Sequence, residues 1–328
     1  MRRLLVIGCV LVGAVAGGAQ PAFGCDCGST VGPVSGGSGA SAPAGGARYV
    51  ALAGSPTTLV ALDRTGAATH WSTLPGFWGT PQVTFQGATG GVSGDGRTVV
   101  VQQISATYPA RVTRFAVLLT RSFRVRRMVT LPGDFSFDAI SPDGRTLYLI
   151  QHPQPGALSY KVRAYDVRHG RLLEKAITDP TRWGPVMHGV AMSRVGPVDG
   201  TRAYTLYDEG RGRTFIHALD TVHGTALCID LPRVSPGTMP GLALSPDDAV
   251  LTVTEDGRPF QTIDTRTYVM APVVRQPTVS KSGAASAPSP SGTPWGVVAG
   301  VLAAALGAAV AVALVRRGTL PLWRPRSD

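Results

Sequence analysis

The chain has little lysine and few acidic residues, so arginine dominates its charge. Of 31 basic residues only Lys161, Lys175 and Lys281 are lysines, and the chain has 20 acidic residues, which gives a formal net charge of +11. Nucleic-acid-binding domains gather basic side chains on one face or along one helix. An arginine excess of this kind is instead typical of a GC-rich genome. We therefore predict no nucleic-acid partner.

Cysteine is scarce, which limits the disulfides that the chain can form. Outside the signal sequence predicted below, only Cys25, Cys27 and Cys228 remain, an odd number. Residues 28–46 are a spacer rich in Gly, Ser and Ala, which spans some 60 Å at ~3.3 Å per residue, so the N-terminal cysteines can reach Cys228. A Cys27–Cys228 bridge is one prediction. A Cys25–Cys27 bridge, a buried thiol at Cys228 and a lipid on Cys25 are the alternatives.

Catalytic signatures are also missing. The chain contains no Gly-x-Ser-x-Gly elbow, no His-Glu-x-x-His pair and no phosphate-binding loop. Its six histidines show no metal-ligand spacing, and His169 and His223 occupy equivalent turns in successive units. A lactonase-like metal site requires several converging carboxylates or amides, which the sequence does not obviously supply. We predict no catalytic residue, no metal and no cofactor.

Two apolar runs lie at the ends of the chain. Residues 1–24 are predicted to be a signal peptide, with Arg2-Arg3 before the apolar residues 4–16 and small residues at the cleavage site before Cys25. Residues 295–315 carry no charge over 21 positions, and as a helix they would span about 31 Å, one hydrocarbon core. Arg316 and Arg317 follow directly, so the positive-inside rule places the C-terminus in the cytoplasm and the preceding ectodomain outside the cell.

Composition shifts divide the chain into six segments. The spacer at the N-terminus and a Pro/Ser-rich stalk before the apolar run both have the composition of flexible linkers. The predicted segments are a signal peptide (1–24), a spacer (25–46), an ectodomain (47–275), a stalk (276–293), a transmembrane helix (294–315) and a basic cytoplasmic tail (316–328).

A turn motif repeats through the ectodomain. Its clearest copy is Ser141-Pro142-Asp143-Gly144, which lies between two apolar runs. Pro142 fixes φ and Gly144 can adopt positive φ, so the motif predicts a β-hairpin. Aligned on the turn serine, the copies start at Ser93, Ser141, Ser193 and Ser245, at spacings of 48, 52 and 52 residues. The third copy is looser and reaches its turn, Asp199-Gly200, only after an insertion. One further step back reaches Ser41, in a degenerate first unit.

Further marks recur within each unit. An aspartate ends an apolar run at Asp63, Asp166, Asp220 and Asp264, where its side chain can accept hydrogen bonds from the turn. The best-preserved unit predicts strands at 135–140, 147–151, 161–166 and 172–177. Four antiparallel strands per repeat of 40–50 residues are typical of a propeller blade. We predict an all-β fold: a small β-propeller of about five four-stranded units, the first degenerate and without its innermost strand, plus one C-terminal transmembrane helix.

The repeated unit resembles a known group of proteins. Ser141-Pro-Asp-Gly-Arg-Thr-Leu-Tyr148, followed by an apolar strand that ends in Asp166, is similar to the YVTN, TolB and WD40-like propeller repeats of bacteria. The resemblance covers residues 49–274. It implies a propeller, in a group that includes binding scaffolds, surface-layer proteins and lactonase-type enzymes. With the signal peptide, stalk and single span, the whole chain resembles an actinobacterial single-pass surface protein.

The resemblance places a ligand site at one mouth of the channel, on the loops that lead into the innermost strands. These loops are 77–88, 133–137, 181–188 and 233–240. They carry aromatic, basic and imidazole side chains that suit a sugar, a peptide or an anionic group. The alternative for the tryptophans is packing between blades. The candidate ligand-binding residues are Trp78, Trp183, Arg182, His188 and Arg233.

Strand alternation makes two predictions about outer strands. Arg124 and Arg126 share one face of a charged edge strand, which discourages edge-to-edge pairing; contact with an anionic polymer or headgroup is the alternative. In the fourth unit Cys228 lies opposite Leu227 and Ile229. If the leucine and isoleucine pack between blades, Cys228 faces the outer, accessible side.

The sequence therefore predicts a membrane-anchored, cell-surface propeller that acts as a non-catalytic binding or interaction module. Its partner would be a protein or a ligand of the cell envelope. A propeller-type hydrolase or lactonase acting at the channel mouth and a purely structural envelope protein are the alternatives. Convergent histidines and carboxylates at one mouth would favour the enzyme, and an aromatic and arginine lining would favour binding.

Overall fold

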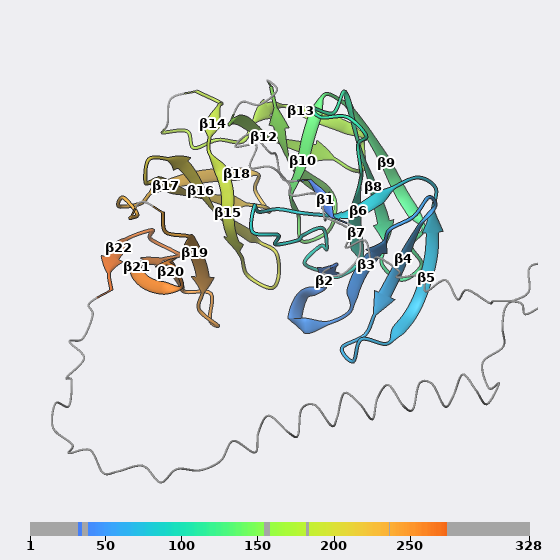
Figure 1. The fold of residues 1–328 in the computed structure, drawn as a ribbon, viewed down its shortest axis with the longest axis horizontal. Coiled ribbons are helices and arrows are strands. Elements are labelled where there is room, and N and C mark those ends of the chain that lie inside the picture. Colours follow the sequence, from blue (N-terminus) through green and yellow to red (C-terminus); the bar gives the residue numbers. More distant parts are fainter. Residues whose placement is uncertain (1–31, 35–38, 154–157, 182–183, 236, 274–328) are drawn as a thin grey trace, which may run out of the picture. The chain divides into compact units, whose positions relative to one another are not determined.

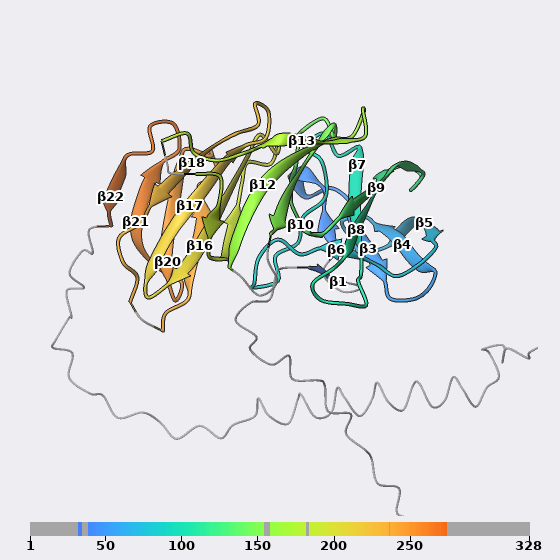
Figure 2. The same ribbon diagram turned by 90° about the horizontal axis from the view of Figure 1, so that it is seen from above.

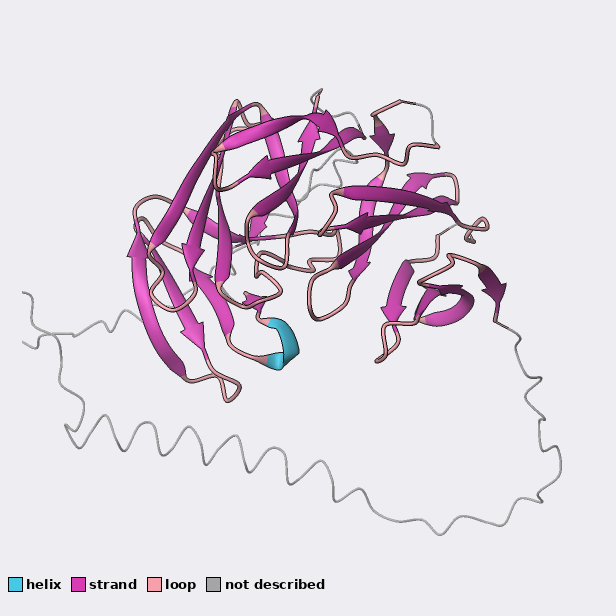
Figure 3. Ribbon diagram, turned by 180° about the vertical axis from the view of Figure 1, so that it is seen from behind, coloured by secondary structure: helices cyan, strands magenta, loops and turns pink. Residues whose placement is uncertain are grey.

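The structure, a computed structural model, describes residues 32–34, 39–153, 158–181, 184–235 and 237–273. Over these residues the fold is all-β, with five antiparallel sheets and a single 3-10 helix, η1 (Pro43–Gly45) (Figures 1 and 3). No helix in this part of the chain has the length and apolar character needed to cross a membrane. The predicted signal peptide, stalk, transmembrane helix and tail lie outside the described residues.

Each sheet is built around an antiparallel meander of four strands that follow one another along the chain, and only β1 and β14 pair with strands that are not their neighbours in sequence among the described residues. The first sheet consists of β2 (Ala40–Ser41), β3 (Arg48–Leu52), β4 (Thr57–Leu62) and β5 (Ala68–Leu74). The second consists of β1 (Pro33–Val34), β6 (Trp78–Pro81), β7 (Thr98–Gln103), β8 (Val112–Leu119) and β9 (Val125–Pro132).

The three remaining sheets follow the same order. The third consists of β10 (Asp134–Ile140), β11 (Thr146–His152), β12 (Ser159–Asp166) and β13 (Arg171–Ala176), and β14 (Met187–His188) also pairs with β12. The fourth consists of β15 (Val190–Val195), β16 (Arg202–Gly210), β17 (Arg213–Asp220) and β18 (Thr225–Asp230). The fifth consists of β19 (Pro240–Leu244), β20 (Val250–Glu255), β21 (Arg258–Asp264) and β22 (Met270–Pro272), the last three side by side in Figure 2.

The repeated turn motif forms hairpins by the predicted mechanism. Ser141 Oγ donates to Asp143 Oδ1 (2.7 Å) and accepts from the backbone N–H of Thr146 (2.9 Å). Gly144 has a φ of +67°, a conformation that glycine adopts without steric cost. Ser93 and Ser245 make the same pair of bonds. The four strands predicted for this unit are confirmed as β10 to β13.

The third and first units differ from this motif. In the third, Ser193 is not a turn serine, whereas the predicted turn at Asp199-Gly200 is confirmed. Ser193 lies inside β15, where its Oγ accepts from the backbone N–H of Leu242 on β19 (3.0 Å). The turn of that unit comes later, closed by Asp199, whose Oδ1 accepts from the backbone N–H of Thr201 (2.9 Å). The first unit also has an innermost strand after all, the two-residue β2, which pairs with β3.

The core is divided among four clusters of buried side chains, each built by two consecutive sheets. Along β11 the side chains alternate between two of them: Leu147 and Leu149 pack against the second sheet, and Tyr148 and Ile150 pack against the fourth. Both faces of an inner sheet are therefore buried, as expected for sheets stacked face to face. Five such sheets in chain order are consistent with a β-propeller.

Candidate functional site

A cavity of about 420 Å³ lies where the third and fourth sheets meet. One wall consists of described residues between β13 and β15, in the ranges 178–181 and 184–188, the second of which contains β14. The other is formed by the end of β16, the start of β17 and the outer strand β18. The described residues that line it are Thr178, Asp179, Thr181, Gly184, Val186, Met187, His188, Glu209, Phe215, Cys228 and Asp230.

Asp179 fixes the segment that forms the first wall. The residue is 3% exposed. Its Oδ1 accepts from the backbone N–H (2.8 Å) and the hydroxyl (2.6 Å) of Thr181, and its Oδ2 accepts from the backbone N–H of Cys228 (2.9 Å). One carboxylate thus closes its own turn and holds the segment against the edge of β18, where charge-assisted hydrogen bonds are strong.

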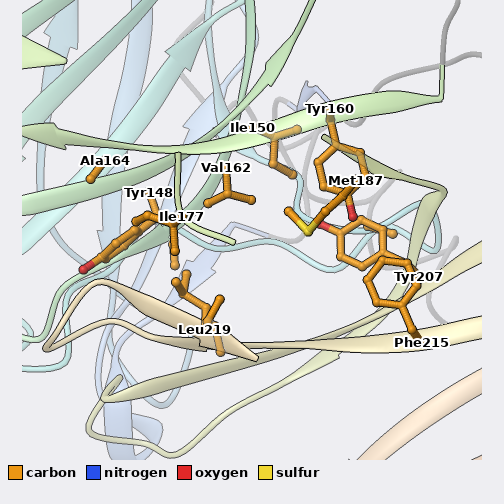
Figure 4. Packing of buried hydrophobic residues seen from close by; sticks show 14 residues of the cluster. Tyr148, Ile150, Tyr160, Val162, Ala164, Ile177, Met187, Tyr207, Phe215 and Leu219 are labelled. Atoms are coloured by element: carbon orange, nitrogen blue, oxygen red, sulfur yellow. The ribbon is translucent and has the colours of Figure 1, made fainter. Parts of the chain in front are cut away.

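One aromatic ring in the described lining of the cavity, Phe215, belongs to a stack of three buried rings. Phe215 stacks on Tyr207 at 5.3 Å, and Tyr207 stacks on Tyr160 at 4.9 Å. Figure 4 shows these rings gathered with Met187 at one end of the cluster. Burial raises the pKa of both tyrosines well above 10, so their hydroxyls remain protonated and neutral.

A buried ion pair lies close to these rings and joins the third sheet to the fourth. The guanidinium of Arg194 on β15 donates to the backbone carbonyl and to the carboxylate of Asp138 on β10. The Asp138 side chain is 2% exposed and that of Arg194 is 12% exposed. His217 on β17 lies near this pair, and burial lowers its pKa to about 4, so its ring is neutral at pH 7.

The charge of the cavity is opposite to that of the chain. Asp179, Glu209 and Asp230 line it, and among its described lining residues there is no lysine or arginine. One of these carboxylates has a basic neighbour: Arg213 Nε lies 3.8 Å from Glu209 Oε2. The cavity therefore offers carboxylates, threonine hydroxyls and an aromatic face, a set that suits a cation with an apolar stem.

Two of the residues selected from the sequence meet in this cavity. His188, at the end of β14, and Cys228, on β18, line it together. Arg233 is exposed and lies elsewhere, with Nη1 donating to the carbonyl of Arg211 (3.2 Å). Arg182, Trp183, Cys25 and Cys27 lie outside the described residues, so the predicted Cys27–Cys228 bridge stays a prediction.

Trp78 lies in the core, not on an open loop. It is 3% exposed and begins β6, in the cluster shared by the first and second sheets. Its Nε1 donates to the carbonyl of Pro75 (2.7 Å). Packing between sheets, the alternative raised for this residue, therefore describes its position, because the loop predicted at 77–88 begins as a strand.

The predicted outward orientation of Cys228 is wrong. The residue is half-buried and packs against the cluster between the third and fourth sheets, whereas its neighbour Ile229 belongs to the cluster between the fourth and fifth. Both faces of β18 are covered by adjacent sheets, so alternation along this strand separates two interfaces and not inside from outside.

The sequence reasoning did not select Glu209, Asp230 or Phe215. The signal for Glu209 was present in Tyr207-Asp208-Glu209-Gly210, a strand end followed by a turn glycine, which places acidic side chains at a sheet end. Asp230 follows Cys228 by two residues on β18, so strand alternation places both on the same face. Within the described residues, no three His, Cys, Asp or Glu side chains are grouped so that they could hold a metal ion.

Comparison with known proteins gives a likeness of fold. No family model and no curated protein matches the sequence. Kuenenia stuttgartiensis hydrazine synthase is 18% identical, over 72% of this chain and 78% of that chain (TM-score 0.40). TolB from Acinetobacter baumannii is 15% identical, over 68% and 50% (TM-score 0.41), and oligogalacturonate lyase in complex with manganese is 12% identical, over 73% and 64% (TM-score 0.44). The structural neighbours thus include TolB-like and other propeller proteins, at a distance that says nothing about ligand or activity.

Proposed function

We propose that this chain is a membrane-anchored binding module of the cell surface, whose cavity beside β18 receives a cationic side chain of a protein ligand. The observation that carries the proposal is the lining of that cavity, where Asp179, Glu209 and Asp230 stand beside His188. In a partly enclosed site the attraction of a cation is screened less than on an open surface. The Phe215 ring adds a face for an ammonium or guanidinium group.

Asp179 supports a binding role in a second way. Because its oxygens accept hydrogen bonds from Thr181 and Cys228, one wall of the cavity is held in position before any ligand arrives. A preorganised wall reduces the ordering cost of association. The half-exposed Glu209 and the exposed His188 and Asp230 are then the side chains that the ligand reaches first.

The location rests on the two ends of the sequence. The uncharged residues 295–315 followed by Arg316 and Arg317 support a single span with its C-terminus in the cytoplasm. The signal-peptide features of residues 1–24 support export of the ectodomain. Protease added to intact cells should then remove the ectodomain and leave a short membrane-bound stub, and release of the whole protein by a salt wash would contradict the anchor.

Binding can be measured on the purified full-length chain by fluorescence anisotropy with a labelled peptide of alternating Lys and Gly. The Glu209→Gln variant should weaken binding about tenfold, because one charge-assisted contact is lost. The matched control is Glu174→Gln, which makes the same change on the exposed outer strand β13 and should leave the affinity unchanged. Raising the salt concentration should weaken binding by the wild type.

Three results would overturn this proposal. Equal binding of a Glu-Gly peptide would show that the cavity does not select cations. Equal affinity of Glu209→Gln and the wild type would place the peptide elsewhere. Cleavage of the peptide, detected by mass spectrometry, would favour the hydrolase alternative over a binding role.

A further inference from the structure

A second cavity, of about 270 Å³, lies at the end of the inner strands β7 and β10. Its described lining has fewer charged side chains than that of the first cavity and more neutral polar groups. No lysine or arginine is among its described lining residues, and Asp134 is its one acidic residue. Its described lining includes Gln102, Gln103, Tyr108, Asp134, Phe135 and Ser136.

Gln102 has a buried acceptor that a ligand in this cavity could bind. The residue is 5% exposed, and its Nε2 donates to the carbonyl of Phe135 (3.1 Å). Its Oε1 is buried and has no hydrogen-bond partner among the described residues. Buried acceptors in folded proteins are nearly always paired with protein, water or ligand. A hydroxyl donor bound in the adjoining cavity would supply that partner.

The rest of the polar lining is neutral and held in position. Ser136 Oγ lies 3.2 Å from His152 Nε2, and burial lowers the pKa of His152 to about 4, so the imidazole is uncharged at pH 7. Gln103 Oε1 accepts from Arg114 Nη1 (3.1 Å), which orients its amide. Burial raises the pKa of Asp134. Apart from Asp134, these lining groups accept and donate hydrogen bonds without carrying charge.

Apolar surface completes the site. Phe135 is buried in its wall, and Tyr108 and Ile104, which also line it, are 55% and 39% exposed. Amphipathic rings such as tyrosine offer a flat apolar face beside polar groups. A ligand that fits this lining carries several hydroxyls, one apolar face and no charge.

We propose that this cavity binds a single sugar ring of a neutral saccharide. The volume is slightly below the ~300–1,000 Å³ of pockets for drug-sized ligands, which suits one ring and not a chain of them. Hydroxyls of the ring donate to Gln102 Oε1 and to the Asp134 carboxylate, and its apolar face rests on Tyr108. The site is separate from the cavity beside β18 and does not depend on the cationic ligand.

The test uses the purified full-length chain and saturation-transfer NMR with D-glucose, D-galactose, D-mannose and N-acetyl-D-glucosamine, each offered separately. At least one sugar should bind, with a dissociation constant in the millimolar range expected for about a dozen non-hydrogen atoms. Glucuronate should bind more weakly than the sugar it resembles, because its carboxylate would lie near Asp134.

Two variants and a control locate the site. Gln102→Leu should lose about tenfold or more in affinity, because leucine removes the unpaired acceptor. Leucine also removes the donor to the Phe135 carbonyl, so affinity is compared at a temperature at which circular dichroism shows the variant to be folded. Asp134→Ala should lose a similar amount. Gln261→Leu changes an equally buried glutamine on β21, 6% exposed, and should bind sugar as the wild type does. No binding of any of the four sugars, or equal binding by the wild type and Gln102→Leu, would overturn the proposal.

Discussion

The two faces of the third sheet pack against their neighbours with different chemistry. On one face Leu147 and Leu149 join an almost entirely apolar cluster with the second sheet. On the other face Tyr148 joins a cluster with the fourth sheet that holds three buried tyrosines (Figure 4), and the Asp138–Arg194 pair lies beside it. We refer to these as the apolar interface and the polar interface.

The two interfaces contribute differently to the stability of the fold and to the relative position of its sheets. Apolar contacts stabilise an interface in proportion to the area buried and tolerate small shifts. A buried ion pair adds little net stability because of its desolvation cost. Its hydrogen bonds nevertheless fix the position of β10 relative to β15. The candidate cavity lies along the polar interface. We infer that the apolar interface holds the domain together and that the polar interface sets the geometry of the site.

The largest effect is expected from breaking the ion pair on one side. Asp138→Ala leaves the Arg194 guanidinium largely buried without its carboxylate, and the free energy of unfolding should fall by about 3–5 kcal/mol. Chemical denaturation of the full-length chain, followed by tryptophan fluorescence, measures the loss.

The double variant Asp138→Leu/Arg194→Met is the control for that prediction. Replacing a buried pair by apolar residues of similar size is often neutral or stabilising, so most of the lost stability should return. The double variant should still bind the peptide more weakly than the wild type, because the ion pair no longer fixes the relative position of the third and fourth sheets. Full affinity in the double variant would contradict the role that we assign to the pair.

The apolar interface should respond through lost packing alone. Leu149→Ala, at a position that is fully buried, should lower the free energy of unfolding by about 2–5 kcal/mol through burial and cavity terms. Leu149→Met should cost less than about 1.5 kcal/mol. Neither change should alter peptide affinity under conditions in which the protein is folded. A change in affinity with either variant would mean that the two interfaces are not separable.

The pH dependence of stability should arise from buried histidine. Burial lowers the pKa of His217 and of His152 to about 4, below the unfolded value near 6.5, so the unfolded chain binds more protons between these values. Stability is therefore fully present above pH 6.5 and is lost as the pH falls towards 4, by about 1.4 kcal/mol per pH unit for each histidine.

His217→Phe tests the part that belongs to the polar interface. Its Nε2 is buried and has no hydrogen-bond partner among the described residues, so phenylalanine removes the titration without breaking a bond at that atom. Denaturation curves between pH 6.5 and 4.5 should show about half the wild-type slope. An unchanged slope would mean that His217 does not control acid sensitivity.

The order of strands was predictable from local signals in the chain. Two local signals depend on only a few residues each: the turn Ser141-Pro142-Asp143-Gly144 and the turn-closing Asp166. Both make the hydrogen bonds that the sequence predicted. Spacing misplaced only the turn serine of the third unit, because an insertion extends β15 to Val195 and Ser193 therefore lies inside the strand. The turn at Asp199-Gly200 was predictable from its own residues.

The candidate site was predictable only in part. His188 and Cys228 were selected for separate reasons, and their meeting depends on the pairing of β14 with β12. That pairing joins residues far apart in the sequence and has no local signal. Trp78 was misplaced because the predicted loop begins as strand β6. Cys228 was misplaced because alternation assigns side chains to two faces, but in stacked sheets both faces are interior.

The smallest expected change in stability comes from removing one tyrosine hydroxyl at each interface. Tyr148 Oη donates to the carbonyl of Thr221 (2.9 Å), a bond between the third and fourth sheets, and Tyr148→Phe should cost about 0.5–1.5 kcal/mol. Tyr165 packs in the apolar interface, and Tyr165→Phe should change the free energy of unfolding by less than about 0.5 kcal/mol, as is usual where no buried bond is lost. Both variants remove one oxygen from a buried tyrosine, so denaturation under identical conditions isolates the bond. Equal losses would show that the two interfaces do not differ in the way their polar groups are used.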